Sequence, residues 1–112
     1  MKHTKNHKYE PSTAARELYL YATNNGDLYR RQISYIENNL RKKIAKGVYD
    51  HNKAVDAFYY AADNASRLYN NDFGYSFSVT ERYTAAVDMA DDFILENATP
   101  EQLETLHAVK IA

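Results

Sequence analysis

With 112 residues, the chain is long enough for one packed domain and too short for two independent cores. Hydrophobic residues make up 45% and charged residues 26%, with only 3 glycines and 2 prolines, so the composition argues against a disordered chain or a turn-rich β fold. The absence of cysteine excludes disulfides, thiolate zinc sites and thiol nucleophiles. No apolar run approaches the ~18 residues that span a bilayer, and no signal-peptide pattern opens the chain, so we expect a cytoplasmic protein without membrane contacts.

The formal charge of −1 hides an uneven distribution. Residues 1–53 hold 11 lysines and arginines against 5 acidic residues, whereas residues 54–112 hold 3 against 10. Such asymmetry occurs in proteins that bind nucleic acid or an acidic partner, and also where two halves complement each other within one fold or across a dimer. The composition leaves these explanations open.

Residues 1–11 carry three lysines and no apolar period, which predicts a flexible basic arm ahead of a single helical domain over residues 12–112. Ser12 is a suitable N-cap for a first helix that runs to about Thr23. The following stretch, residues 24–27 with sequence NNGD, predicts both the end of this helix and the cap of the next one.

The second helix is predicted from Leu28 to Lys46, where Gly47 ends it. Its apolar residues recur at intervals of 4, 3, 4 and 4, which is typical of one buried stripe of an α-helix. The stripe consists of Tyr29, Ile33, Ile36, Leu40 and Ile44.

Three further helices are predicted in the second half of the chain. Asp50 caps a third helix that runs to about Asn70, and its buried face is expected to hold Ala54, Val55, Phe58, Ala61, Ala62, Ala65, Leu68 and Tyr69. Ser78 and Glu81 form a capping box for a fourth helix, whose expected buried residues are Val79, Tyr83, Ala86, Val87, Ala90, Phe93 and Ile94. Pro100 begins a short last helix. We therefore expect an all-α fold, a compact bundle of about five helices with three long central ones, the second to the fourth.

The histidines His3, His7, His51 and His107 are the residues with the clearest catalytic or metal-binding repertoire. His3 and His7 have the spacing of two ligands on one helical face, but they lie where no helix is predicted. No nucleophile elbow and no phosphate-binding glycine loop is present, and Asp91 and Asp92 would point about 100° apart on a helix. We therefore expect a protein that is not an enzyme and has no cofactor and no metal.

A basic strip is predicted on the second helix, opposite its buried stripe. It consists of Arg31, Tyr35, Asn38, Lys42 and Lys46. Such a strip can bind an acidic protein surface, follow a phosphate backbone, or simply remain solvated. For a nucleic-acid surface the expected residues are Arg30, Arg31, Arg41, Lys42, Lys43 and Lys46 of this helix, together with Lys2, Lys5 and Lys8 of the arm.

Two further features concern binding. An acidic row is predicted on the outer side of the fourth helix, formed by Glu81, Asp88, Asp92 and Glu96. It could imitate phosphates, but a chain at −1 is less acidic than such mimics usually are, and pairing with a basic surface in a homodimer explains it better. Among the 11 tyrosines, Tyr35 and Tyr60 are expected to point outward, as interface anchors do.

Several sequence segments carry a resemblance to a known class of proteins: residues 27–32 (DLYRRQ), 39–43 (NLRKK), 46–50 (KGVYD) and the alanine-rich third helix. Over about residues 17–94, the chain resembles small uncharacterised helical proteins encoded by bacteriophages and mobile elements. The resemblance transfers no catalytic residue. It implies a phage-type accessory protein that acts inside a bacterial cell.

The sequence therefore favours a non-enzymatic protein-interaction module, a phage-encoded regulator or inhibitor of a larger host or defence complex, of the anti-CRISPR or anti-restriction type. Its predicted partner surface is Arg31, Tyr35, Asn38, Lys42, Lys46 and Tyr60. A nucleic-acid-binding accessory protein and a minor structural component of the virion are the alternatives.

Overall fold

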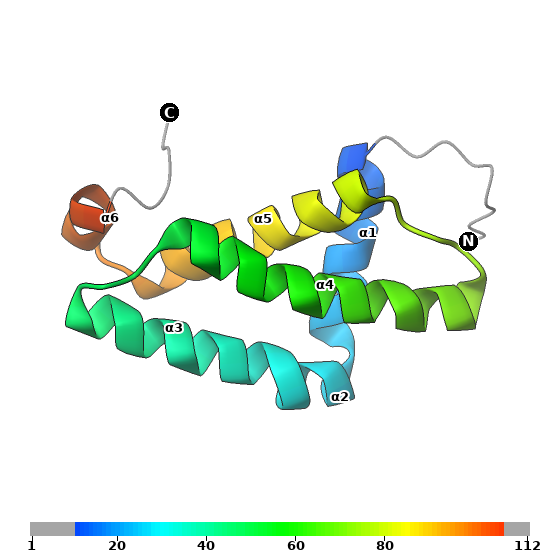
Figure 1. Ribbon diagram of the computed structural model, residues 1–112, viewed down its shortest axis with the longest axis horizontal. Helices are drawn as coiled ribbons and strands as arrows, with labels where there is room; N and C mark the ends of the chain where they lie inside the picture. The colour runs from blue at the N-terminus through cyan, green and yellow to red at the C-terminus, as the bar shows by residue number, and fades with distance from the viewer. Residues whose placement is uncertain (1–10, 107–112) are drawn as a thin grey trace.

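The computed structural model describes residues 11–106, which form helices joined by short loops, with no strand in that range (Figure 1). In chain order these are α1 (Pro11–Asn24), α2 (Gly26–Leu28), η1 (Tyr29–Ile33), α3 (Ser34–Lys46), α4 (His51–Phe73), α5 (Val79–Asn97) and α6 (Pro100–Leu106). Because α2, the π-helical turn η1 and α3 follow one another without a break, they form one helix over residues 26–46. The predicted all-α bundle of about five helices is confirmed. Within the described range, no helix is long and apolar enough to cross a membrane.

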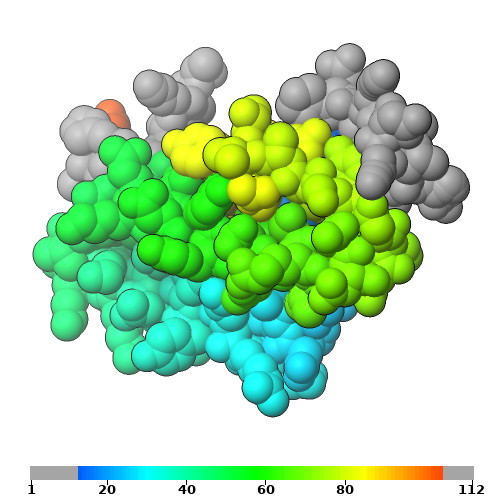
Figure 2. All heavy atoms as spheres, turned by 45° about the vertical axis from the view of Figure 1, so that its right-hand side comes forward, coloured from blue at the N-terminus to red at the C-terminus, as the bar shows by residue number. Residues whose placement is uncertain are grey.

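The centre of the bundle consists of α1, α4 and α5, which pack against one another through small side chains. The fully buried alanines at this centre are Ala14, Ala15, Ala22, Ala61, Ala62, Ala65, Ala85, Ala86 and Ala90. Alanine side chains let helix backbones approach closely, and the larger Leu18, Phe58 and Phe93 fill the remaining space. The helix over residues 26–46 lies along one edge of α4 instead (Figures 1 and 2). The expectation that the second helix belongs to the centre is therefore wrong, and α1 takes its place.

The helix ends follow the predicted caps closely. The side-chain oxygen of Asn25 accepts a hydrogen bond from the Leu28 amide, and Asp50 accepts two from the first turn of α4. The predicted capping box is complete, because Ser78 accepts from the Glu81 amide while the Glu81 carboxylate accepts from the Ser78 amide. These caps satisfy backbone donors that a helix N-terminus otherwise leaves without a partner.

Three predicted helix boundaries differ from the structure. The second helix begins at Gly26 rather than at Leu28, because Asn25 is its N-cap. α4 continues to Phe73, three residues beyond the predicted end, because Gly74 is the first residue to adopt the left-handed conformation (φ 74°) that terminates it. α1 already includes Pro11 and Ser12, so Ser12 is not its N-cap. The remainder of the predicted arm, with Lys2, Lys5, Lys8, His3 and His7, lies outside the described residues, as does His107.

The π-helical turn η1 changes the buried stripe of the second helix. A π turn closes over five residues rather than four, so the residue that shares a face with Ile33 is Leu28 rather than Tyr29. Leu28 and Ile33 are buried, whereas the Tyr29 side chain is exposed and donates a hydrogen bond to Glu37 at 3.2 Å. The predicted burial of Tyr29 is wrong, while that of Leu40 and Ile44 is confirmed.

The buried face of α5 also differs from the prediction. Val79 and Tyr83 are exposed, and Met89 and Glu81 are buried in their place. A hydropathy pattern treats glutamate as an exposed residue, so it predicts that the side of α5 with Glu81 faces solvent. On α4, only Leu68 departs from the predicted buried set, with 40% of its surface exposed.

Candidate functional site

The basic strip lies on the outer side of the helix over residues 26–46, where the sequence places it. All five of its members are exposed: Arg31, Tyr35, Asn38, Lys42 and Lys46. Tyr35 is 75% exposed and Tyr60, on α4, is 69% exposed, which makes them the most exposed large hydrophobic side chains of residues 13–104. The outward orientation predicted for both tyrosines is confirmed.

The basic side chains of this helix fall into two groups. Arg30 and Arg31 lie 3.3 and 3.7 Å from the Asp27 carboxylate. Lys42, Lys43 and Lys46, in contrast, form no ion pair with any residue of the described range. The free positive charge is thus concentrated at the C-terminal end of α3.

Arg41 has a structural role that the sequence did not indicate. It lies 3.6 Å from Glu37, donates a hydrogen bond to Asn97 at 3.0 Å, and stacks 5.8 Å from the centre of the Phe93 ring. These contacts attach α3 to the C-terminal half of α5. The guanidinium is 46% exposed but already engaged by neighbouring side chains, which makes it a poorer phosphate contact than the three lysines.

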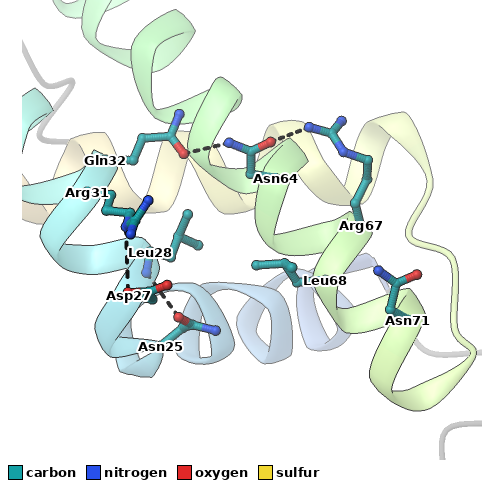
Figure 3. Close-up of a pocket in the computed structure, with 9 residues that line it drawn as sticks. All are labelled: Asn25, Asp27, Leu28, Arg31, Gln32, Asn64, Arg67, Leu68 and Asn71. Atoms are coloured by element: carbon teal, nitrogen blue, oxygen red, sulfur yellow. Dashed lines mark hydrogen bonds and ion pairs between the residues drawn. The ribbon is translucent and has the colours of Figure 1, made fainter.

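A groove separates the start of the helix over residues 26–46 from the second half of α4, and we call it the amide groove (Figure 3). The wall formed by the helix over residues 26–46 and its N-cap consists of Asn25, Asp27, Leu28, Arg31 and Gln32. From α4 the groove is lined by Asn64, Arg67, Leu68 and Asn71. Its volume is about 710 Å³, within the range of about 300–1,000 Å³ that is usual for ligand sites.

Hydrogen bonds fix one end of the amide groove. The Asn64 amide donates to the Gln32 side-chain oxygen at 2.8 Å, and the Asn64 oxygen accepts from Arg67 (Figure 3). Arg67 is held in turn by Asp63 at 2.8 Å. This chain of side chains joins the two walls of the groove.

Tyr35 and Tyr60 flank that same end of the groove. The two helices run in opposite directions (Figure 1), so the residues that follow Gln32 lie beside those that precede Asn64. Tyr35 is three residues past Gln32 and Tyr60 is four residues before Asn64, which places each about one helical turn, or about 5 Å, beyond the hydrogen bond. Arg31 belongs to both the basic strip and the amide groove, so the two adjoin, and Tyr60 lies on α4 about one turn beyond the same end of the groove.

The acidic row does not form the outer face that the sequence predicted. Glu81 is buried, where it serves the capping box and accepts a hydrogen bond from the Tyr75 hydroxyl. Asp92 accepts a hydrogen bond from Tyr19 of α1 at 2.5 Å, and Asp88 is half-buried. Glu96 alone of the four is exposed. The predicted outer position is therefore wrong for Glu81, and Asp92 is engaged by α1, which packs against α5. The pairing of this row with a basic surface in a homodimer stays a prediction.

Burial and neighbouring charges shift the pKa of two groups along this seam. Burial, followed by the carboxylates of Asp92 and Asp91, raises the pKa of Asp88, and nearby Arg16 offsets part of this rise. Burial and the hydrogen bond to Asp92 raise the pKa of Tyr19 well above its usual value. Both shifts follow from packing α1 against α5.

A chain of three hydrogen-bonded side chains joins the loop after α3 to α5. The Tyr49 hydroxyl lies 2.7 Å from His51 Nδ1, and His51 Nε2 lies 2.7 Å from the Asp91 carboxylate. A carboxylate only accepts, so Nε2 carries a proton and donates to Asp91; in the neutral imidazole, Nδ1 then accepts from the Tyr49 hydroxyl. Burial, together with the charges of Asp91 and Asp50, raises the pKa of Tyr49 well above its usual value.

This arrangement resembles parts of catalytic triads but holds the loop in place instead. Both nitrogens of His51 are already bonded to protein groups, and Tyr49 is only 7% exposed, so a substrate would have to displace a buried hydrogen bond to reach the imidazole. The sequence could not indicate this chain, because His51 and Asp91 lie 40 residues apart. Among residues 11–106, no group of three or more histidine, aspartate or glutamate side chains could hold a metal ion.

Comparisons of the chain with protein-family models, with curated proteins and with solved structures find no match. The candidate functional site is therefore the surface that contains the basic strip, Tyr60 and the amide groove.

Proposed function

We propose that the chain is a non-enzymatic protein-interaction module that binds an acidic surface of a partner protein through the basic strip and Tyr60. The exposure of Tyr35 and Tyr60 at one end of the amide groove carries this proposal. Tyrosine combines a large apolar ring with a polar tip and loses little entropy on binding, so it is enriched among the residues that dominate interface energies. Two such exposed rings on neighbouring helices are more than solubility requires.

The charge of this surface supports an acidic partner. Residues 26–46 hold six basic and two acidic residues, a net charge of +4 on one helix of a chain whose total is −1. Lys42 and Lys46, which have no ion-pair partner in the described range, extend the strip beyond Tyr35. Complementary charge steers association and selects among partners.

The resemblance to phage-encoded proteins supports a narrower version of the proposal. A short, cysteine-free chain with two exposed aromatic anchors fits a regulator or inhibitor that occupies a surface of a larger host or defence complex in the bacterial cytoplasm, of the anti-CRISPR or anti-restriction type. Such a role needs only a binding surface, and a small bundle suffices to hold one in place.

The test is affinity capture from nuclease-treated bacterial extract, with the tagged chain as bait and mass spectrometry as readout. We expect one stoichiometric protein partner for the unmodified chain and its loss for Tyr35→Ala combined with Lys42→Glu. A matched control, Tyr83→Ala combined with Lys43→Glu, removes an exposed tyrosine and reverses a lysine outside the strip. Equal recovery of the partner by both double variants would show that the strip is not the binding surface.

Nucleic-acid binding is the second candidate, favoured by Lys42, Lys43 and Lys46, which have no ion-pair partner among the described residues. Since Asp27 and Glu37 lie beside the arginines of the same helix, about three phosphate contacts remain on this helix. Three contacts predict that the logarithm of the affinity for duplex DNA falls with a slope of about −2.7 against the logarithm of salt concentration. Fluorescence anisotropy over a salt series measures this slope. Here Lys43→Glu should weaken binding as much as Lys42→Glu, which separates this function from the leading one.

A further inference from the structure

We propose that the amide groove receives an acidic peptide segment of the partner, with one leucine-sized side chain seated against Leu68 and carboxylates at Arg31 and Arg67. This inference rests on the proposed function and adds the chemical class of the segment that is recognised. The strip and the groove then bind different parts of the partner: the basic strip binds its acidic surface, and the groove binds a short peptide segment.

The floor of the groove is apolar and incompletely covered. Leu28 and Leu68 face it from opposite helices (Figure 3). Leu28 is buried, whereas 40% of Leu68 remains open to solvent although its position in α4 follows the buried stripe. A leucine-sized side chain placed there would remove apolar surface from water on both partners.

The rim of the groove offers more donors than acceptors. The oxygens of Gln32 and Asn64 already accept hydrogen bonds, which leaves the Gln32 amide N–H groups available. Asn71 forms no side-chain hydrogen bond with any residue between 11 and 106. Asn71 and Gln32 can therefore donate to peptide carbonyl oxygens from opposite ends of the groove, as amide side chains do when they bind an extended backbone.

The charges of the rim select an acidic segment over a basic one. Two guanidinium groups, Arg31 and Arg67, line the groove with one carboxylate, Asp27, which is shared between Arg30 and Arg31. Arg67 is 65% exposed and pairs with a second carboxylate, Asp63, which lies outside the lining. Arg31 is bound only loosely there, at 3.7 Å with 81% of its side chain exposed, so a peptide carboxylate can approach it without breaking a tight pair. A guanidinium also binds a carboxylate through two parallel hydrogen bonds, which an ammonium group cannot form.

The backbone geometry of the groove is itself unusual. The π-helical turn η1 places Leu28 on the floor while Arg31 and Gln32 remain on the rim. π turns make up well under 1% of residues and occur frequently at functional sites. An uninterrupted α-helix with four-residue spacing would instead align Tyr29 with Ile33.

The experiment is a titration of the isotope-labelled chain with three synthetic peptides, followed by backbone amide chemical shifts. The probes are acetyl-Glu-Asp-Leu-Asp-Glu-amide, the same peptide with alanine for leucine, and the same peptide with lysine for every acidic residue. We expect the first peptide to shift the amides of Asn64, Leu68 and Asn71, the alanine peptide to bind about tenfold more weakly, and the lysine peptide to leave them unchanged.

Two variants and a control test the assignment within the chain. Leu68→Ala and Arg67→Glu should each weaken the first peptide about tenfold, whereas Asp56→Asn, an exposed change elsewhere on α4, should leave it unaltered. The amide spectrum of each variant also reports whether it is folded, and all three positions lie outside the buried core.

The outcomes separate this inference from the proposed function. Equal binding of the leucine and alanine peptides, or shifts confined to another face, would overturn the groove assignment. The strip would still stand if Tyr35→Ala with Lys42→Glu abolishes partner capture. Conversely, peptide binding in the groove together with undiminished capture by that double variant would retain the groove and refute the strip.

Discussion

The packing of α1, α4 and α5 through alanines makes a strong prediction for Ala62→Leu. Ala62 has no exposed surface, so the three added carbon atoms find neither solvent nor a cavity. Adding methylene groups to a well-packed core costs about 1–3 kcal/mol, and we expect about 2 kcal/mol here. For a domain of this size, such a change lowers Tm by about 8 °C, at about 4 °C per kcal/mol.

The assay is urea unfolding and thermal melting followed by circular dichroism, with Ala45→Leu as the matched control. Ala45 is exposed on α3, and the same substitution there should change the free energy of unfolding by less than about 0.5 kcal/mol. A change in Tm of less than about 2 °C for Ala62→Leu corresponds to less than about 0.5 kcal/mol. That result would show that α1, α4 and α5 do not pack against one another through their alanines. The bundle centre described above would then be wrong.

Three further predictions concern the caps and the titrating groups. Ser78→Ala removes the side-chain acceptor of the capping box and should lower the free energy of unfolding by about 1 kcal/mol in urea titrations, an effect that an unchanged midpoint would contradict. The folded-state pKa of Asp88 is raised above 3.8, so the stability linked to its protonation is complete below that pH and is lost as pH rises through the folded pKa. Asp88→Asn should therefore raise Tm at neutral pH, and this gain should shrink toward pH 3.8. A gain that stays constant with pH would contradict this linkage. The raised pKa values of Tyr19 and Tyr49 imply stability that is complete below about pH 10 and falls above it, so Tyr19→Phe and Tyr49→Phe should each lose less stability than the unmodified chain in alkaline melts, and parallel curves would refute this.

Much of the fold follows from local signals in the sequence. Asp50, Ser78 and Glu81 cap helices as predicted, and the cap expected within residues 24–27 is Asn25, because a cap depends on side chains within three residues of the backbone groups that they satisfy. The centre of the bundle could not be read in the same way. Periodicity shows that a helix has a buried face but not which neighbour covers it, and α1 is more deeply packed than the longer helix over residues 26–46.

The two errors in the buried stripes have identifiable causes. A single π turn displaces the apolar face by one residue, so Leu28 is buried in place of Tyr29. No residue type in that turn indicates a π turn from the sequence. Glu81 is buried because its own capping bonds and Tyr75 satisfy its carboxylate, which a hydropathy pattern cannot register.

The candidate surface was predicted in part. The exposed positions of Tyr35, Lys42 and Tyr60 follow from helical periodicity alone, since each lies opposite a recognisable buried stripe. The amide groove depends on how two helices lie side by side, and Gln32 and Asn64 meet across 32 residues of sequence. The hydrogen bond from Tyr19 to Asp92, across 73 residues of sequence, likewise depends on how two helices pack together.

The central claim is that the face bearing Tyr35 and Tyr60 contacts a protein partner. Site-specific photo-crosslinking in bacterial cells tests it most directly, with a photoreactive phenylalanine analogue at position 35, 60 or 83 in separate variants. Our account predicts that positions 35 and 60 crosslink to one and the same protein, while position 83, an exposed tyrosine on α5, does not. Crosslinks to nucleic acid from position 35, or equal crosslinking from position 83, would contradict it.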